Sequence, residues 1–156
     1  MSVRIGIGLG QGIWPSDTTS TAFLWQFIDR CEASPIDSIW ISDRIVGPSR
    51  LLEPITALAA IAGRTKRLKF GPSVLALSLR NPVVLAKEIA TLDYISNGRM
   101  LPAVGLGTEN ESEYRACGVR KWERAQRTDE AISLLRRLWT DDHVTHHGRF
   151  YLCDDI

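Results

Sequence analysis

The feature that most constrains this 156-residue chain is a regular alternation of short apolar, strand-like segments with helix-like segments. Apolar residues at three- and four-residue spacing predict the helices, and short apolar runs rich in branched residues predict the strands. The predicted strands cover residues 3–9, 38–42, 68–77 and 100–106, the predicted helices cover 21–33, 55–63, 83–95, 111–116 and 122–139, and a hairpin is predicted over 143–152. Strict strand–helix alternation favours parallel strands with crossover helices. We therefore expect an α/β protein with four parallel strands.

Two architectures satisfy this order, an open doubly wound sheet and the first half of a (β/α)8 TIM barrel. A dinucleotide-binding sheet would carry the pattern GxGxxG directly after its first strand. The first turn, GIGLGQG over residues 6–12, contains no matching window, and the third glycine is also missing after Gly105 and Gly107. Taken alone, glycines in these places are better explained by close packing and tight turns. The fingerprint therefore does not support an NAD-binding sheet, and the architecture stays open on these residues alone.

Composition and charge exclude several classes of partner. The 19 basic and 18 acidic residues give a formal net charge of +1, so neither a nucleic acid nor a membrane is expected as a partner. The longest near-continuous apolar run, Ile55 to Ala62, is too short to span a bilayer. The three cysteines form no CxxC pair, and the first residues lack the layout of a signal peptide. We expect reduced thiols and a cytoplasmic protein.

The stretch from Phe70 to Gly107 reads FGPSVLALSLRNPVVLAKEIATLDYISNGRMLPAVGLG. It resembles the luciferase-like monooxygenase family, including its F420-dependent members. The family pattern is G-x-x-V, then R-x-P, then A-K-x-x-A-T-L-D-x-x-S-x-G-R, then G-x-G, and every element is present. Segments 37–43, 113–119, 123–140 and 147–151 also resemble the family. The resemblance covers essentially the whole chain, but only the first half of a family member.

This resemblance implies a fold and an activity. Residues 1–156 would form a partial barrel domain, the first half of a (β/α)8 TIM barrel with strands one to four. The implied enzyme is a flavin-dependent oxidoreductase or monooxygenase that acts on paired donors. It would use reduced FMN or F420 on a small organic substrate.

A complete barrel needs about 250 residues, and a half barrel exposes the edges of its first and fourth strands. The sequence is therefore either a truncated piece, or two copies pair as a homodimer that completes the barrel. The alternative function is a non-catalytic half barrel that self-associates or binds flavin without turnover.

Functional residues of such barrels lie at the carboxyl ends of the strands, here residues 10–14, 42–44, 72–75 and 107–110. Trp14 is a candidate neighbour of the flavin or substrate. The resemblance implies a non-prolyl cis peptide between Ser73 and Val74, behind the flavin ring. Without the resemblance, an ordinary trans strand with a bulge at Pro72 would be expected.

Asp43 and Arg44 occupy the place where many family members have Asp-His. That histidine would donate or accept a proton near the flavin. Arginine is effectively always protonated, so Arg44 is a poor acid or base. Arg44 would stabilise an anionic reduced flavin or bind an acidic group of the substrate, or else it would pair with Asp43 at the surface. Arg44 is thus a catalytic candidate and Asp43 a cofactor-binding candidate.

The segment after the fourth predicted strand supplies further candidates. The resemblance implies that its polar side chains and backbone amides hydrogen-bond the flavin, which selects Gly107, Thr108 and Asn110. Glu109 would be a catalytic acid or base if burial raised its pKa. The alternative for Asn110 and Glu111 is the N-terminus of a helix, where capping and acidic side chains are favoured.

Two other groups are interpreted as structural. The diagnostic residues at the end of the third helix and the start of the fourth strand lie on the stability face of the barrel. They are Asp93, Ser96, Gly98 and Arg99. The histidines at positions 143, 146 and 147 fit no standard metal-site spacing, so a solvated hairpin without metal is expected.

Overall fold

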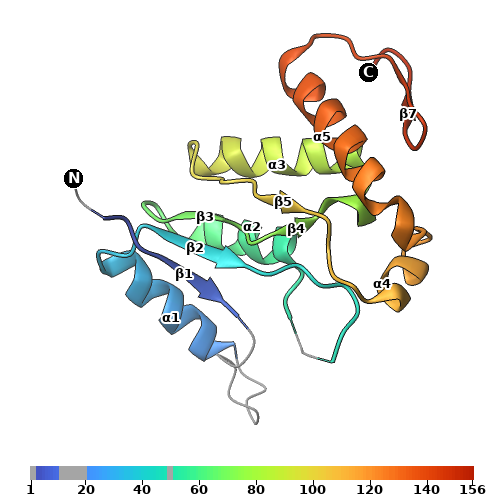
Figure 1. Ribbon diagram of the computed structural model, residues 1–156. Coiled ribbons are helices and arrows are strands. Elements are labelled where there is room, and N and C mark those ends of the chain that lie inside the picture. The colour runs from blue at the N-terminus through green and yellow to red at the C-terminus, as the bar shows by residue number, and fades with distance from the viewer. Residues whose placement is uncertain (1–2, 11–20, 49–50) are drawn as a thin grey trace.

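The computed structural model describes residues 3–10, 21–48 and 51–156, and Trp14 therefore lies outside the described residues. Strands and helices alternate along the chain (Figure 1). The strands are β1 (Gly6–Leu9), β2 (Ser38–Ile41), β3 (Lys69–Pro72), β4 (Leu75–Ala76) and β5 (Val104–Gly105). The helices are α1 (Ala22–Ala33), α2 (Pro54–Arg64), α3 (Pro82–Ser96), α4 (Glu111–Ala116) and α5 (Arg124–Thr140), with short 3-10 helices η1 (Leu77–Leu79) and η2 (Lys121–Glu123). The predicted hairpin is confirmed as the antiparallel pair β6 (His146–His147) and β7 (Leu152–Cys153).

The strands are parallel, as expected, but they do not form four continuous strands of one sheet. Strands β1, β2 and β3 form one parallel sheet, and β4 and β5 form a second parallel pair. The third predicted strand is divided because its backbone changes partner. The N–H of Ser73 donates to the Ile41 carbonyl at 2.7 Å, whereas the N–H of Leu75 donates to the Ala103 carbonyl at 2.9 Å. The chain thus leaves β2 and joins the strand that follows α3.

Local sequence signals place the helix ends. Both α2 and α3 begin with proline at the first turn, where its missing N–H costs nothing. The Asn81 side chain accepts hydrogen bonds from the N–H groups of Val83 (2.9 Å) and Val84 (3.2 Å). At the other end of α3, Asn97 and Gly98 have φ angles of 58° and 75°, which end the helix.

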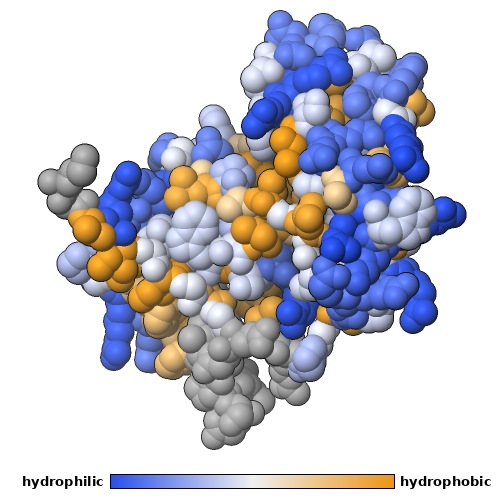
Figure 2. Space-filling view, viewed as in Figure 1, coloured by the Kyte–Doolittle hydropathy of each residue, from blue (hydrophilic) through white to orange (hydrophobic). Residues whose placement is uncertain are grey.

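The core lies between the helices and one face of the strands. The register pairs Ile39 of β2 with Phe70 of β3, and both side chains are fully buried. In the next pair, Trp40 projects from the opposite face because side chains alternate along a strand, and its ring lies over Gly71. Figure 2 shows apolar surface over the strands, whereas α4, α5 and the hairpin are mostly hydrophilic. Within the described residues, no helix has the length and apolar character needed to cross a bilayer.

Candidate functional site at the carboxyl ends of the strands

The bulge between β3 and β4 carries the first predicted site residues. The peptide bond between Ser73 and Val74 is cis, which confirms the expectation and excludes the trans alternative. Both residues are exposed, Val74 to 45%. A Cβ on Gly105 would come 2.6 Å from the Val74 Cγ2, so the valine lies across the glycine of β5. The bulge therefore presents an apolar side chain at the carboxyl edge of both sheets.

Asp43, directly after β2, is held inside the molecule. Its side chain is 1% exposed, and its carboxylate accepts hydrogen bonds from the Ala76 N–H and from the Arg80 guanidinium, each at 2.9 Å. Arg80 also pairs with Glu53 at 2.9 Å. Burial alone would lower the pKa of Arg80, but the two carboxylates raise it overall. Asp43 therefore anchors the end of β2. Little of its side chain is exposed for the predicted contact with a cofactor.

Arg44 takes no part in this ion pair, and its side chain lies against Gly47. It is half-buried and makes no hydrogen bond or ion pair within the described part of the chain. Pairing of Arg44 with Asp43 is therefore wrong, because Arg80 already occupies that carboxylate. The next two residues, Ile45 and Val46, are 48% and 37% exposed. The loop thus places an arginine without an ion-pair partner among the described residues beside exposed apolar side chains.

Glu113 was not singled out by the sequence, yet it joins two of the strand-end loops. Although a carboxylate, it is only 1% exposed. It accepts hydrogen bonds from the N–H groups of Ile45 (2.6 Å) and Val46 (3.2 Å) and from the Thr108 hydroxyl (2.8 Å). The only sequence signal was the family-like Glu113-Tyr114 pair, because a glutamate in a short polar helix otherwise predicts a solvated side chain.

The turn after β5 depends on Gly107. Its φ angle is 87°, a left-handed conformation that favours glycine. A Cβ there would come 2.7 Å from the Tyr114 hydroxyl and 3.2 Å from the Ala76 Cβ. Tyr114 is fully buried, and its hydroxyl lies 2.7 Å from the Leu106 carbonyl. Packing and backbone conformation both therefore require glycine at position 107.

Asn110 caps α4, which confirms the helix-terminus alternative for this residue. Its side-chain oxygen accepts from the Ser112 N–H at 3.2 Å and from the Ser112 hydroxyl at 2.7 Å. Its amide nitrogen donates to the Val46 carbonyl at 3.1 Å. Thr108 and Asn110 are thus brought together with the Arg44 loop.

Glu109 does not meet the condition set for a catalytic acid or base. Its side chain is 74% exposed and pairs with Lys121 at 2.7 Å and Arg124 at 2.5 Å. The hydrogen bond from Lys121 and both positive charges lower the pKa of Glu109 instead of raising it. The sequence could not distinguish this exposed ion pair from a buried carboxyl group.

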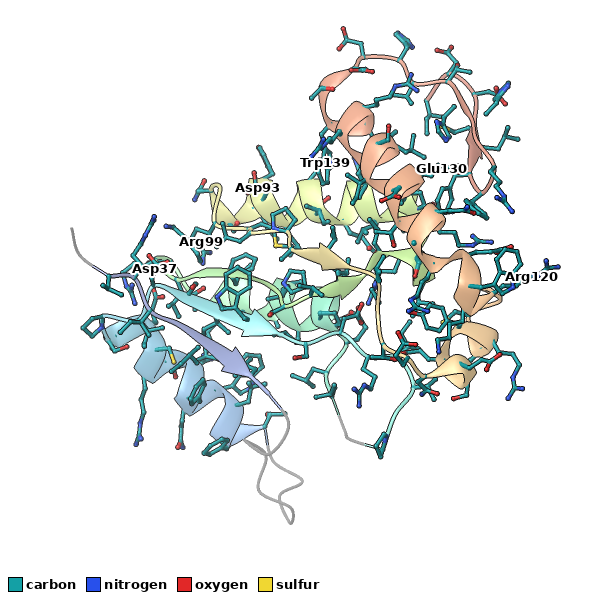
Figure 3. The ribbon with its side chains drawn as sticks, viewed as in Figure 1. Asp37, Asp93, Arg99, Arg120, Glu130 and Trp139 are labelled. Carbon is teal, nitrogen blue, oxygen red and sulfur yellow. The ribbon has the colours of Figure 1, made fainter. Side chains whose placement is uncertain are left out.

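At the amino ends of the strands, polar side chains are engaged in hydrogen bonds with the backbone. Figure 3 shows Asp37 and Arg99 at that amino end, and Arg120 far from them. The Arg99 guanidinium donates to the carbonyls of Ala62, Thr65, Leu68 and Ser96. The structural interpretation of Arg99 is therefore confirmed, and the carboxyl end remains as the candidate site.

The hairpin histidines lie elsewhere and bind carboxylates. His146 contacts Glu130 at 3.1 Å, His143 contacts Asp155 at 2.8 Å, and His147 pairs with Asp154. Within the described ranges, no group of three or more histidine, cysteine or carboxylate side chains could hold a metal ion.

The sequence and the structure are both similar to known proteins. The sequence model of the luciferase-like monooxygenase family matches residues 2–156. The chain is 38% identical over 138 residues to an F420-dependent glucose-6-phosphate dehydrogenase of Amycolatopsis mediterranei, covering 82% of this chain and 40% of that protein.

Two solved structures share the fold. An F420-dependent secondary alcohol dehydrogenase in complex with an F420-acetone adduct matches with a TM-score of 0.80 and 25% identity, over 100% of this chain and 48% of the other. The oxygenating constituent of 3,6-diketocamphane monooxygenase from Pseudomonas putida, in complex with FMN, matches with a TM-score of 0.87 and 20% identity, over 99% and 44%. The chain thus spans less than half the length of each of these proteins.

Proposed function

Because this chain belongs to the luciferase-like monooxygenase family, we propose that it forms a flavin-dependent oxidoreductase site that uses reduced F420 or FMN on a small organic substrate. One observation carries the proposal. Arg44 is a cation without an ion pair in the described part of the chain, and it lies beside exposed apolar side chains at the strand ends where barrels of this class bind ligands. F420 is preferred because a relative with 38% identity over most of this chain is F420-dependent.

The residues at this edge fit a flat, largely apolar ring with an anionic tail. Val74 and Leu106 are 45% and 43% exposed and offer apolar contact. At the end of β1, no atom of the described residues would lie within 4 Å of a Cβ on Gly10. We assign the bulge at Ser73 and Val74 to the ring. The backbone of Gly107 and the side chains of Thr108 and Asn110 follow the fourth predicted strand, at the same edge, and are assigned to hydrogen bonds with the cofactor.

When bound, such a cofactor supplies hydride transfer or oxygen activation, and the protein supplies position and charge. Arginine is a poor acid or base, so the role assigned to Arg44 is to stabilise negative charge on the reduced ring or to bind an acidic group of the substrate. Asp43 acts indirectly, because its contacts with Arg80 and Ala76 fix the loop that carries Arg44. Glu109 is not assigned a proton-transfer role, because Lys121 and Arg124 hold it ionised at the surface.

We further propose that the parallel strands form the first half of a (β/α)8 barrel, spanning residues 1–156 as one domain. Among the described strands, β1 pairs only with β2 and β5 pairs only with β4. An isolated parallel bridge between Phe70 and Met100 joins β3 to the segment that leads into β5. Two copies could complete the barrel as a homodimer. A mass measurement in solution tests this pairing, and a monomeric mass would exclude it.

The function is tested by equilibrium titration of the 156-residue chain with F420 and with FMN, followed by fluorescence. We expect saturable binding, and we expect Arg44→Met to weaken it about tenfold or more because a charge-assisted contact is lost. Arg30→Met is the matched control. Arg30 is an exposed arginine of α1, away from the strand ends, with no hydrogen bond or ion pair within residues 3–10, 21–48 and 51–156.

Each outcome decides part of the proposal. Binding of neither cofactor would contradict the proposed function of this chain. Binding that Arg44→Met leaves unchanged would remove Arg44 from the site. Binding without consumption of reduced cofactor in the presence of acceptor substrates or oxygen would support the non-catalytic flavin-binding alternative, which the lack of a histidine at this edge favours.

A further inference from the structure

We propose that Glu113 is a positioning residue that joins the Arg44 loop to the Thr108 turn and thereby sets where Arg44 meets its ligand. The effect of Glu113 on ligand binding rests on the proposed function, whereas its contacts with the Arg44 loop do not depend on any ligand. Glu113 belongs to α4 and contacts backbone groups 67 and 68 positions away along the chain.

The chemistry of a carboxylate suits this place. Three donors converge on Glu113, the N–H groups of Ile45 and Val46 on one oxygen and the Thr108 hydroxyl on the other. An ionised carboxylate accepts at both oxygens, whereas a glutamine would turn an NH2 donor towards one of these groups. Among the described residues, Glu113 forms no ion pair, so hydrogen bonds alone satisfy its buried carboxyl oxygens. The N–H groups of Ile45 and Val46 thus require an acceptor at this position, and a charged carboxylate is a stronger acceptor than an amide oxygen.

Other contacts fix the same loop from both sides. Before Arg44, the Asp43 carboxylate is held by Arg80 and by the Ala76 N–H. After it, the Val46 carbonyl accepts from the Asn110 amide at 3.1 Å. The backbone around Arg44 is therefore anchored at positions 43, 45 and 46, whereas the Arg44 side chain itself has no such partner in the described part of the chain.

This arrangement explains how a charged side chain could be held ready without an ion pair of its own. A free arginine on an unanchored loop would lose conformational freedom when it bound a ligand, and that loss weakens binding. Anchoring the backbone on Glu113 removes part of that loss in advance. Glu113 therefore acts through Arg44 and not by contact with the ligand.

The first test is amide hydrogen exchange of the 156-residue chain, compared with Glu113→Gln. We expect the amides of Ile45 and Val46 to exchange about tenfold faster in the variant, because their acceptor is weakened. Glu32→Gln is the matched control, since Glu32 likewise accepts three hydrogen bonds, all from backbone N–H groups, of Lys66, Arg67 and Leu68 at the amino end. It should leave the exchange of Ile45 and Val46 unchanged. Unchanged exchange in Glu113→Gln would overturn the inference.

The second test is a double-mutant cycle on F420 and FMN affinity. We expect Glu113→Gln to weaken binding several-fold, and the double variant with Arg44→Met to bind within about twofold of Arg44→Met alone. Additive losses, or a Glu113→Gln chain with full affinity, would overturn the positioning role. If Glu113→Gln does not fold, Glu113→Asp, which keeps the carboxylate but shortens its reach to the Ile45 and Val46 N–H groups, enters the cycle in its place. If the unmodified chain binds neither cofactor, the proposed function fails, and the exchange rates alone decide whether Glu113 holds the loop.

Discussion

The two ends of the strands are built from similar side chains but use them differently. At the amino end, Arg99 donates to four backbone carbonyls, and Glu32 accepts from three backbone N–H groups. At the carboxyl end, Arg44 has no partner within the described ranges, and Val74 and Leu106 expose apolar surface. Polar groups at the amino end are occupied in holding the backbone, whereas the carboxyl end leaves one charge and an apolar surface for a ligand. The comparison predicts that the largest loss of stability comes from a change at the amino end, and the largest loss of cofactor affinity from a change at the carboxyl end.

The largest loss of stability is expected at the amino end. Replacing Arg99 by methionine removes the donor for four carbonyls and for the Thr65 hydroxyl. We expect the free energy of unfolding in urea to fall by about 3–4 kcal/mol, since buried acceptors lose their partner. Arg64→Met, which breaks an exposed pair with Asp29, should cost less than about 1 kcal/mol. Equal losses in the two variants would contradict the comparison.

The next largest loss is expected beneath the candidate site. Asp43→Ala removes the buried partner of Arg80 and leaves that guanidinium with Glu53 only. Breaking a buried pair from one side should lower the free energy of unfolding by about 3 kcal/mol. Urea unfolding measures this loss, and cofactor titration of the folded variant shows whether the Arg44 loop has also moved. A loss below about 1 kcal/mol would show that Asp43 is not an anchor.

A comparison of Gly107 with Gly63 tests where tertiary packing requires a glycine. Gly107→Ala places a Cβ against the Tyr114 hydroxyl at a φ angle of 87°. We expect a loss of about 2 kcal/mol. Gly63→Ala, within α2, meets nothing within 4 Å and should stabilise the chain by about 0.5 kcal/mol. The two midpoints of thermal unfolding should therefore shift in opposite directions.

A smaller, pH-dependent effect is expected for Glu32. Burial alone would raise the pKa of Glu32, but hydrogen bonds from the N–H groups of Lys66, Leu68 and Arg67 lower it overall. A lowered pKa in the folded chain gives stability that is present above the ordinary value and is lost as the pH falls. The difference in unfolding free energy between the unmodified chain and Glu32→Gln should therefore shrink from about pH 6 to about pH 3. A constant difference across this range would contradict the assignment.

The smallest change in stability is expected for Arg44→Met. Because Arg44 makes no hydrogen bond or ion pair among the described residues, its loss should change the free energy of unfolding by less than about 0.5 kcal/mol. The same variant should have the largest effect on cofactor affinity of the five. A stability loss above about 1 kcal/mol would show that Arg44 is structural and would remove the contrast between the two ends.

Much of the fold could be predicted because its signals are local. Asn81-Pro82 and Asn97-Gly98 mark the ends of α3 through contacts within a few residues, and both ends were predicted to within one residue. The sequence did not predict that the third strand changes its pairing partner. That change, from the Ile41 carbonyl to the Ala103 carbonyl, depends on strands that are far apart in the sequence.

The candidate site was only partly predictable. Strand-end loops and the family pattern selected the bulge at Ser73 and Val74 and the segment around Gly107, and the cis peptide there is confirmed. Glu109 and Glu113 are four residues apart and chemically identical, yet one is 74% exposed and the other is buried. Nothing local distinguishes them, because burial depends on which loops pack against the helix.

The sequence by itself determined the order of strands and helices, the ends of α3 and the family, because these depend on periodicity, capping and an ordered motif. Only the tertiary structure decided which charged side chains form ion pairs or are buried, and which do not. It pairs Asp43 with Arg80, turns Glu109 to solvent and brings Glu113 under the Arg44 loop. The physical reason is that pairing and burial depend on groups tens of residues apart, and no local pattern encodes those distances.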